Sequence, residues 1–184
     1  LEPFLTKCYG VTPMRCRFLK EMYHLKPEII EFLPMGVDDE SIPEDREAVR
    51  TSIREELNIP QNDIVILTGG KIDKWKTQTL LLMNAVQNID RKNLKLVVFG
   101  SVTQELEEKV KELADGQKVQ YIGWVQAKDS YNYFAAADLV VFPGRHSVFW
   151  EQVTGQGIPM LVKDWPGTHH VDLGGNVAFL ENDC

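Results

Sequence analysis

The sequence has few of the residues that cross-link small proteins or bind metals. It contains three cysteines, Cys8, Cys16 and Cys184, with no Cys-x-x-Cys pair, and four histidines. An odd number of widely spaced cysteines builds neither a disulfide framework nor a zinc ribbon. We therefore expect free thiols in a reducing compartment.

A long apolar run, a signal-peptide core and an excess of positive charge are also lacking. No stretch approaches the roughly 20 apolar residues that span a bilayer. The net charge of -7 argues against a nucleic acid bound mainly through its phosphates. We expect a globular, cytoplasmic protein with no transmembrane segment and no nucleic-acid partner. Because the chain starts at Leu1 rather than Met, we interpret it as a piece of a longer protein.

What the sequence does contain is a regular alternation of apolar strands and helices from residue 63 onward. We predict strands at 63–70, 94–100, 118–125, 138–143, 159–164 and 176–180. We predict helices at 77–90, 102–115, 129–137 and around Glu151. Continuously apolar strands that are each followed by a helix indicate a parallel sheet covered on both faces. The predicted fold class is α/β, a Rossmann-like doubly wound parallel sheet.

Two local features and a domain division follow from the same pattern. Helix 77–90 is expected to turn Leu80, Leu81, Asn84, Ala85 and Ile89 to one face, and Asp129 is expected to be an N-cap. The first 33 residues differ in pattern from the rest. We interpret 1–33 as a remnant of a preceding domain and its connection, and 34–184 as the doubly wound domain.

The loops that follow the strands hold the candidate site, because ligands of open parallel sheets bind beyond the carboxyl ends of the strands. After the first strand of the regular run comes "GGKIDKWKT", with Gly69, Gly70 and the lysines Lys71, Lys74 and Lys76. A Gly-Gly turn lets the backbone approach a phosphate, and lysines supply point charges for a diphosphate. The segment fits neither a P-loop nor a G-x-G-x-x-G fingerprint. These lysines could equally be solvated surface residues.

Five passages occur in a characteristic order: "EFLPMGVD" (31–38), "TGGKIDKWKTQTLLLMNAV" (68–86), "LVVFG" (96–100), "VQYIGWVQAKDSYNYFAAADLVVFPG" (119–144) and "WEQVTGQGIPMLV" (150–162). Together they resemble the C-terminal, nucleotide-sugar-binding domain of the GT-B glycosyltransferases of retaining family 4. The resemblance covers residues 33 to about 181. It implies the donor half of a GT-B enzyme.

The resemblance implies a role for each matching residue. Gly69, Gly70, Lys71 and Lys76 would bind the donor diphosphate, and Gly123, Trp124 and Val125 would read the nucleobase. Glu151 would accept hydrogen bonds from the ribose hydroxyls, since two adjacent hydroxyls can donate to one carboxylate. Without the resemblance, Glu151 would be interpreted as a solvated residue in the first turn of a helix.

One departure from the family pattern concerns the donor sugar. The family places a first acidic residue eight positions before the second, and here Pro143 stands at that position. Arg145, His146 and Ser147 occupy the loop and are expected to face the donor sugar, with Arg145 and His146 as weak catalytic candidates. No metal or cofactor is expected, since the adjacent His169 and His170 should not converge on one ion.

The predicted function is retaining transfer of a sugar from a nucleotide diphosphate sugar to an acceptor. An N-terminal acceptor domain of the same protein is the expected partner, and the resemblance allows peripheral membrane association through that domain. We expect the chain alone to bind nucleotide without turnover. The alternatives are a non-catalytic or degenerate nucleotide-sugar-binding domain, a sugar-nucleotide epimerase of GT-B-like architecture, and a receiver-like signalling domain, which would need acidic residues at the strand ends.

Overall fold

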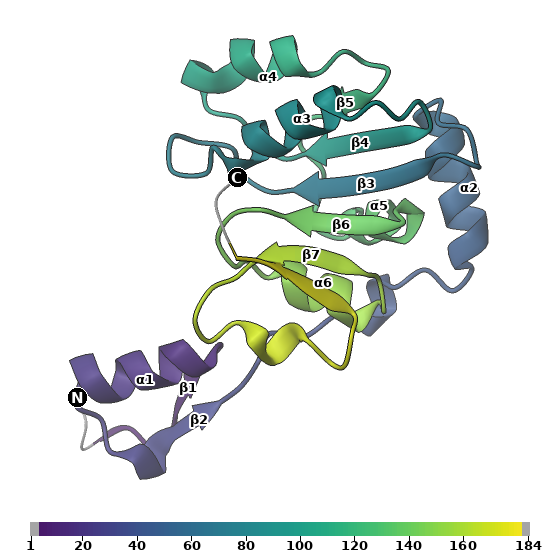
Figure 1. The fold of residues 1–184 in the computed structure, drawn as a ribbon. Helices are drawn as coiled ribbons and strands as arrows, with labels where there is room; N and C mark the ends of the chain where they lie inside the picture. The colour runs from purple at the N-terminus through teal and green to yellow at the C-terminus, as the bar shows by residue number, and fades with distance from the viewer. Residues whose placement is uncertain (1–3, 182–184) are drawn as a thin grey trace.

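A computed structural model describes residues 4–181 of the chain. Its main feature is a six-stranded, entirely parallel sheet (Figure 1). The strands are β3 (Ile64–Gly69), β4 (Leu94–Phe99), β5 (Val119–Tyr121), β6 (Leu139–Phe142), β7 (Met160–Lys163) and β8 (Val177–Leu180). Their spatial order is β5-β4-β3-β6-β7-β8, which is the 3-2-1-4-5-6 order of a Rossmann fold. The predicted fold class is confirmed.

Helices cover both faces of this sheet. They are α2 (Arg46–Glu56), α3 (Gln78–Asn88), α4 (Glu107–Leu113), α5 (Ser130–Ala136) and α6 (Phe149–Gly155), with short 3-10 turns η3 (Asp39–Ser41), η4 (Gln104–Leu106) and η5 (His169–Val171). Asp129 stands at the N-cap position of α5 as expected, but its side chain does not accept a capping hydrogen bond. Among residues 4–181, no helix is both long and apolar enough to cross a membrane.

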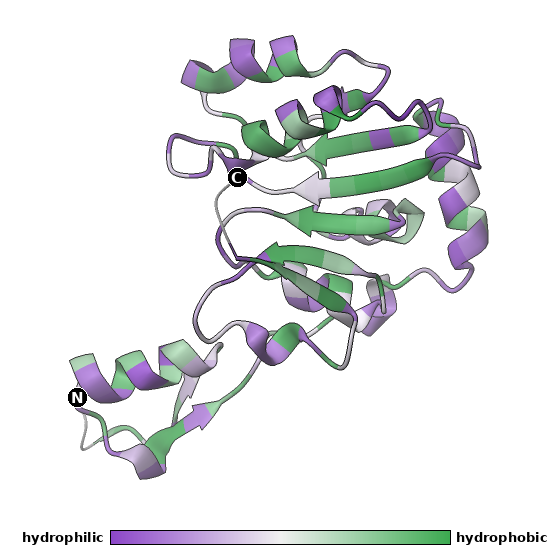
Figure 2. Cartoon of the chain, viewed as in Figure 1, coloured by the Kyte–Doolittle hydropathy of each residue, from purple (hydrophilic) through white to green (hydrophobic). Residues whose placement is uncertain are grey.

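The hydrophobic core has two parts, one on each face of the sheet. Along β4, Val97 and Phe99 pack on the α5 and α6 side, whereas Leu96 and Val98 pack on the α3 and α4 side. Figure 2 shows the strands of this sheet as mostly hydrophobic along their length. This two-sided burial explains why the strands are continuously apolar in sequence rather than alternating.

The buried face of α3 differs from the predicted one. Leu80 faces the core as expected, but its buried companions are Met83 and Val86. The residues expected on the same face as Leu80 are exposed, so that expectation was wrong: Leu81, Asn84, Ala85 and Ile89. The helix carries apolar residues around most of its circumference, and periodicity alone therefore did not identify the inner face.

A buried arginine joins α2 to the sheet. Arg54 donates from Nη2 to Oδ2 of Asp138 at 2.8 Å, and its other nitrogens donate to the carbonyl oxygens of Ala136, Gln61 and Asp63. The same Asp138 oxygen accepts from the backbone of Val65 at 2.7 Å. This network fixes the amino end of β6 beside β3 and so aligns the two strands whose opposite ends form the candidate site.

The first residues form a small separate sheet. Strands β1 (Cys8–Gly10) and β2 (Ile30–Phe32) pair in parallel, joined by α1 (Pro13–Met22) and η2 (Pro27–Ile29). In Figure 1 this unit lies at the lower left, beyond the edge of the six-stranded sheet that β8 forms. Cys8 and Cys16 are free thiols, as expected, and Cys184 lies outside the described residues. The boundary between 1–33 and 34–184 stays a prediction.

Candidate functional site

The candidate site lies at the carboxyl ends of β3 and β6. Connections leave β3 toward one side of the sheet and β6 toward the other, and this switch point is where open parallel sheets bind ligands. A small cavity of about 50 Å³ lies there. Its lining comes from the loops after these two strands and the start of α3: Thr68, Gly69, Gly70, Lys71, Lys76, Gln78, Thr79, Phe142, Pro143, Gly144, Arg145 and Ser147.

A second cavity, of about 290 Å³, adjoins the first through Gly70, Lys71, Lys76 and Ser147. It extends toward the loops after β4 and β5 and the start of α6. The residues that line the second cavity but not the first are Phe99, Gly100, Ser101, Trp124, Val125, Val148 and Phe149. The two adjoining cavities therefore bring together the predicted diphosphate residues and two of the predicted base-reading residues. Gly123 does not line either of them.

The loop after β3 is held in position by a buried side chain. Ile72 is 1% exposed, and its backbone hydrogen-bonds to Ser101 and Thr103 in the loop after β4. This anchor leaves Lys71 and Lys76 on either side of it, both reaching the cavities. Lys71 forms an ion pair with Asp73, with 3.4 Å between Nζ and Oδ2.

Two glycines allow the loops after β3 and β4 to approach each other. Gly100 has a φ of +131°, and a Cβ at this position would lie 1.9 Å from the carbonyl oxygen of Gly70. No side chain could be accommodated at that distance without moving the backbone. The close approach of the two loops therefore depends on glycine at position 100.

Glu151 lies in the first turn of α6 and is buried, with 7% of the residue exposed. Its Oε1 accepts a hydrogen bond from His146 Nε2 at 2.8 Å and another from His170 Nε2 at 2.9 Å. Among the described residues, its Oε2 and the Nδ1 of His170 are buried without a hydrogen-bond partner. Burial acts to raise the pKa of Glu151, but the two imidazole hydrogen bonds outweigh it and the pKa lies below its usual value.

His170 was not predicted as a site residue. It lies in η5, in the loop after β7, and that loop returns to the site because Trp165 Nε1 donates to the carbonyl of Gly144 at 3.1 Å. The loop after β7 begins at the same end of the sheet as the loops after β3 to β6. His170 follows a strand of the predicted sheet, but nothing in the local sequence indicates that its loop folds back to Glu151.

The two adjacent histidines point to different partners, as expected. His169 contacts Oδ1 of Asp164 at 2.7 Å, whereas His170 contacts Glu151. His170 is grouped with His146 rather than with His169. Possible metal-ligand atoms of His146, Glu151 and His170 all lie within 4.8 Å of one another. Two imidazoles and a carboxylate are donors that a zinc ion accepts, so this cluster is the one in residues 4–181 that could hold a metal.

The three residues predicted to face the donor sugar do not share one environment. Arg145 and Ser147 line the small cavity. The ring of His146 instead packs edge-on against the buried Trp150, with 5.1 Å between ring centroids, and its Nε2 contacts Glu151. His146 is therefore engaged with the carboxylate rather than turned into the cavity.

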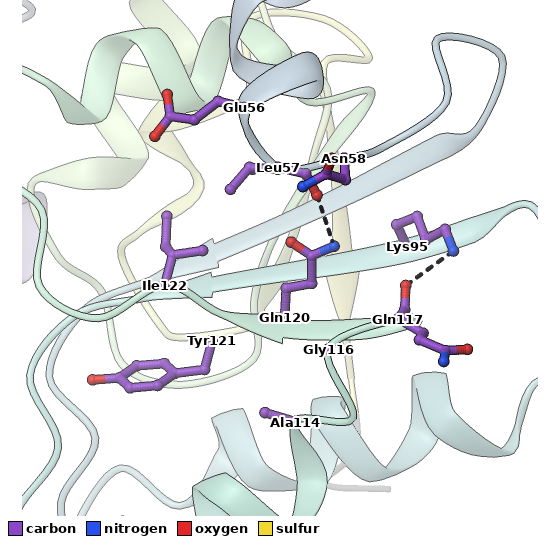
Figure 3. A pocket seen from close by; sticks show the side chains of 10 residues that line it. All are labelled: Glu56, Leu57, Asn58, Lys95, Ala114, Gly116, Gln117, Gln120, Tyr121 and Ile122. Atoms are coloured by element: carbon purple, nitrogen blue, oxygen red, sulfur yellow. Dashed lines mark hydrogen bonds between the residues drawn. The ribbon is translucent and has the colours of Figure 1, made fainter.

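A wider cavity of about 550 Å³ lies elsewhere, between the end of α2, β5 and the loop before β5 (Figure 3). Two of its polar side chains are already engaged: Lys95 Nζ donates to the carbonyl of Gln117 at 2.9 Å, and Gln120 Nε2 donates to that of Leu57 at 3.1 Å. It is not at the switch point and contains none of the predicted site residues. We therefore do not consider it the functional site.

Comparison with known proteins agrees with this geometry. A model of the family described as glycosyl transferases group 1 matches residues 49–161. Mannosylfructose-phosphate synthase of Agrobacterium fabrum (strain C58 / ATCC 33970) is 30% identical over 151 residues, which cover 76% of this chain and 33% of the synthase. The chain thus spans about a third of the length of this curated relative.

Solved structures share the fold. Anabaena Alr3699/HepE, crystallised in complex with UDP and glucose, superposes with a TM-score of 0.74 at 17% identity, over 99% of this chain and 51% of that chain. WaaG, a glycosyltransferase involved in lipopolysaccharide biosynthesis, superposes with a TM-score of 0.71 at 20% identity, over 95% of this chain and 49% of that chain. The family match covers more than half of the chain, and the chain therefore belongs to the glycosyl transferases group 1 family, with the fold of the C-terminal domain of a GT-B glycosyltransferase.

Proposed function

We propose that this chain is the donor-binding domain of a glycosyltransferase that takes its sugar from a nucleotide diphosphate sugar. The observation that carries this proposal is the position of Lys71 and Lys76, which both line the connected cavities at the switch point of the sheet. A diphosphate is the ligand that two lysines and a Gly-Gly turn would suit at this place. The complex of Anabaena Alr3699/HepE with UDP supports the same class of ligand.

Each part of the donor would contact different residues. The diphosphate would lie against Gly69, Gly70, Lys71 and Lys76, the base against Gly123, Trp124 and Val125, and the ribose against Glu151. Arg145 and Ser147 would contact the transferred sugar, while His146 would act through Glu151. We propose no metal in donor binding, because the lysines supply the positive charge that the diphosphate requires.

The chemistry proposed for this domain is electrostatic. As the sugar leaves, negative charge develops on the diphosphate, and Lys71 and Lys76 would stabilise it in a partly enclosed site. This needs no nucleophile from the domain and is compatible with transfer that retains the anomeric configuration. The acceptor would bind to another domain of a longer cytoplasmic protein, since the chain spans about half of the solved glycosyltransferases it resembles.

A second candidate function is a degenerate domain that binds the donor without transfer. One observation favours it: Pro143 stands where the family pattern has its first acidic residue, and Arg145 and Ser147 line the cavity beside it. A carboxylate that could contact sugar hydroxyls is thus replaced by a cation and a hydroxyl. The two candidates share donor binding and differ only in turnover.

Isothermal titration calorimetry of the chain with UDP, GDP and ADP tests the shared part of the proposal. Binding of at least one nucleotide is expected, and failure of all three to bind would contradict both candidates. A sugar-transfer assay on the full-length protein then separates them. Transfer supports the enzyme, and donor binding without transfer supports the degenerate domain.

A further inference from the structure

The carboxylate of Glu151 presents its two oxygens to different surroundings. Oε1 accepts two hydrogen bonds, from His146 at 2.8 Å and from His170 at 2.9 Å. Because an ionised carboxylate can only accept, both imidazoles donate from Nε2. One oxygen is therefore held from two sides by side chains that come from different loops.

Both imidazoles are themselves held by aromatic neighbours. Trp150, which is fully buried, packs edge-on against His146, and Phe32 of β2 packs edge-on against His170 with 5.6 Å between ring centroids. The side chains of His146 and His170 are only 15% and 10% exposed. The two donors are thus fixed in place, and Glu151 cannot rotate without breaking at least one hydrogen bond to Oε1.

The other oxygen lacks a partner. Oε2 is buried and, within residues 4–181, has no hydrogen-bond donor. A buried acceptor without a partner destabilises the protein, so a ligand that donates a hydrogen bond to it recovers that free energy. Because Oε2 is buried, a ligand hydroxyl would reach it only after a neighbouring side chain had moved aside. The hydrogen bonds from the two imidazoles to Oε1 would hold the carboxylate in position during that movement.

We propose that His146 and His170 are positioning residues that hold Oε1 of Glu151 and leave Oε2 as the single acceptor for a ribose hydroxyl of the donor. The inference rests on the proposed function, because it takes a nucleotide as the ligand. It also narrows that function: Glu151 accepts from the ribose through one oxygen rather than through both. The pairing makes recognition of a ribonucleotide depend on His170, which lies outside the segment that matches the family.

The test compares UDP with 2′-deoxy-UDP and 3′-deoxy-UDP by calorimetry on the chain, in the wild type and in single variants. The wild type should prefer UDP over at least one deoxy analogue by about tenfold, the effect of one charge-assisted hydrogen bond. His170→Ala and His146→Ala should bring that ratio close to one. His170→Gln, which retains a side-chain donor, should restore part of it.

The ratio separates positioning from a merely structural role. A loss of stability would weaken binding of UDP and of its deoxy analogues alike and leave the ratio unchanged. His169→Ala is the matched control: this neighbouring histidine is 60% exposed and contacts Asp164, so the variant should keep the wild-type ratio. A wild-type ratio in His170→Ala and His146→Ala, or equal affinity of the wild type for all three nucleotides, overturns the inference and leaves the proposed function standing.

Two other outcomes are also decisive. If the wild type binds none of UDP, GDP and ADP, the proposed function is contradicted, and the inference that rests on it is contradicted as well. If the purified chain retains one zinc ion that His170→Ala loses, a cation rather than a hydroxyl occupies the Glu151 cluster, and the inference is overturned.

Discussion

Lys71 and Asp73 form an ion pair at the mouth of the candidate site, with 3.4 Å between Nζ and Oδ2. Asp73 also accepts a hydrogen bond from the backbone of Trp75 at 2.9 Å. That backbone hydrogen bond and the neighbouring Lys71 and Lys76 together hold the pKa of Asp73 below its usual value. The carboxylate is therefore ionised at neutral pH and would compete for Lys71 with a diphosphate bound at the proposed site.

Replacing this carboxylate should strengthen nucleotide binding. Asp73→Asn keeps an oxygen for the Trp75 backbone but removes the negative charge beside Lys71. We expect UDP to bind about threefold more tightly, less than the tenfold of a full charge-assisted bond because the pair is near solvent. Calorimetry at low salt measures the gain, which should shrink as salt is raised. Weaker binding of UDP would show that Asp73 stabilises the conformation of the loop more than it competes with the diphosphate for Lys71.

The three lysines of the same loop provide an internal comparison. Lys71→Ala and Lys76→Ala should each lower the affinity for UDP by about tenfold, since each removes a cation that we propose contacts the diphosphate. Lys74 lies over the ring of Trp75 and does not line either cavity, so Lys74→Ala should bind UDP as the wild type does. Equal losses in all three variants would mean that general surface charge, not a site, attracts the nucleotide.

Trp124 should report nucleotide binding through its fluorescence. It is 69% exposed and lines the cavity of about 290 Å³ at the candidate site, where a base can stack on its ring. We expect UDP to change the emission of the wild type and of Trp75→Phe, and to change that of Trp124→Phe much less. Trp75 is as exposed as Trp124 but does not line that cavity, which makes it the matched control. If UDP changed the emission of Trp124→Phe as much as that of the wild type, the base would not bind against Trp124.

The buried Arg54 makes the fold sensitive to Asp138. Asp138→Asn leaves the arginine without its counter-ion and should destabilise the chain by about 2 kcal/mol, below the usual figure for fully buried pairs because Asp138 is one-third exposed. Urea unfolding at pH 7 measures the loss. Asp90→Asn, at an exposed position in the loop before β4, should have almost no effect.

The same pair predicts a direction for acid unfolding. Burial acts to raise the pKa of Asp138, but the Val65 backbone, Arg50 and Arg54 lower it below its usual value. A carboxyl with a lowered folded-state pKa contributes stability above its unfolded-state pKa and loses it as the pH falls through the folded-state pKa. The difference between wild type and Asp138→Asn should therefore be full at neutral pH and shrink below about pH 4. A difference independent of pH would contradict this origin.

Gly100 and Gly70 should differ in their tolerance of alanine. Both have φ near +130°, which strains any other residue. At Gly70 the added Cβ would enter open space, whereas at Gly100 it would clash with the Gly70 carbonyl. Gly70→Ala should cost about 1–2 kcal/mol in urea unfolding, and Gly100→Ala clearly more. The reverse order would mean that the two loops separate easily.

The sheet could be predicted from the sequence because burial on both faces leaves an unambiguous pattern. The six strands of the main sheet are mostly apolar, with polar exceptions such as Lys95 in β4 and Gln120 in β5, and strands of this kind that alternate with helices indicate a parallel sheet. The face of α3 could not be predicted in the same way. Apolar side chains surround most of that helix, and only tertiary packing selects Met83 and Val86 over Leu81 and Ile89.

The site was predictable where its residues follow directly after strands. Lys71, Lys76 and Trp124 line the cavities for this reason. The Glu151 cluster was only half predictable, because a buried carboxylate takes whichever donors the fold brings to it. His170 reaches Glu151 through a loop whose position depends on the Trp165 hydrogen bond to Gly144, a contact between residues 21 apart that no local pattern encodes.

The most direct test of the central claim is the location of the nucleotide. We would titrate isotope-labelled chain with UDP and follow the backbone amide resonances by NMR. The shifts should cluster at Gly70, Lys71, Trp124 and Ser147, around the two cavities beyond β3 and β6. Shifts confined to the cavity of Figure 3, at Gly116, Gln117 and Gln120, or no shifts at saturating nucleotide, would contradict the proposed donor site.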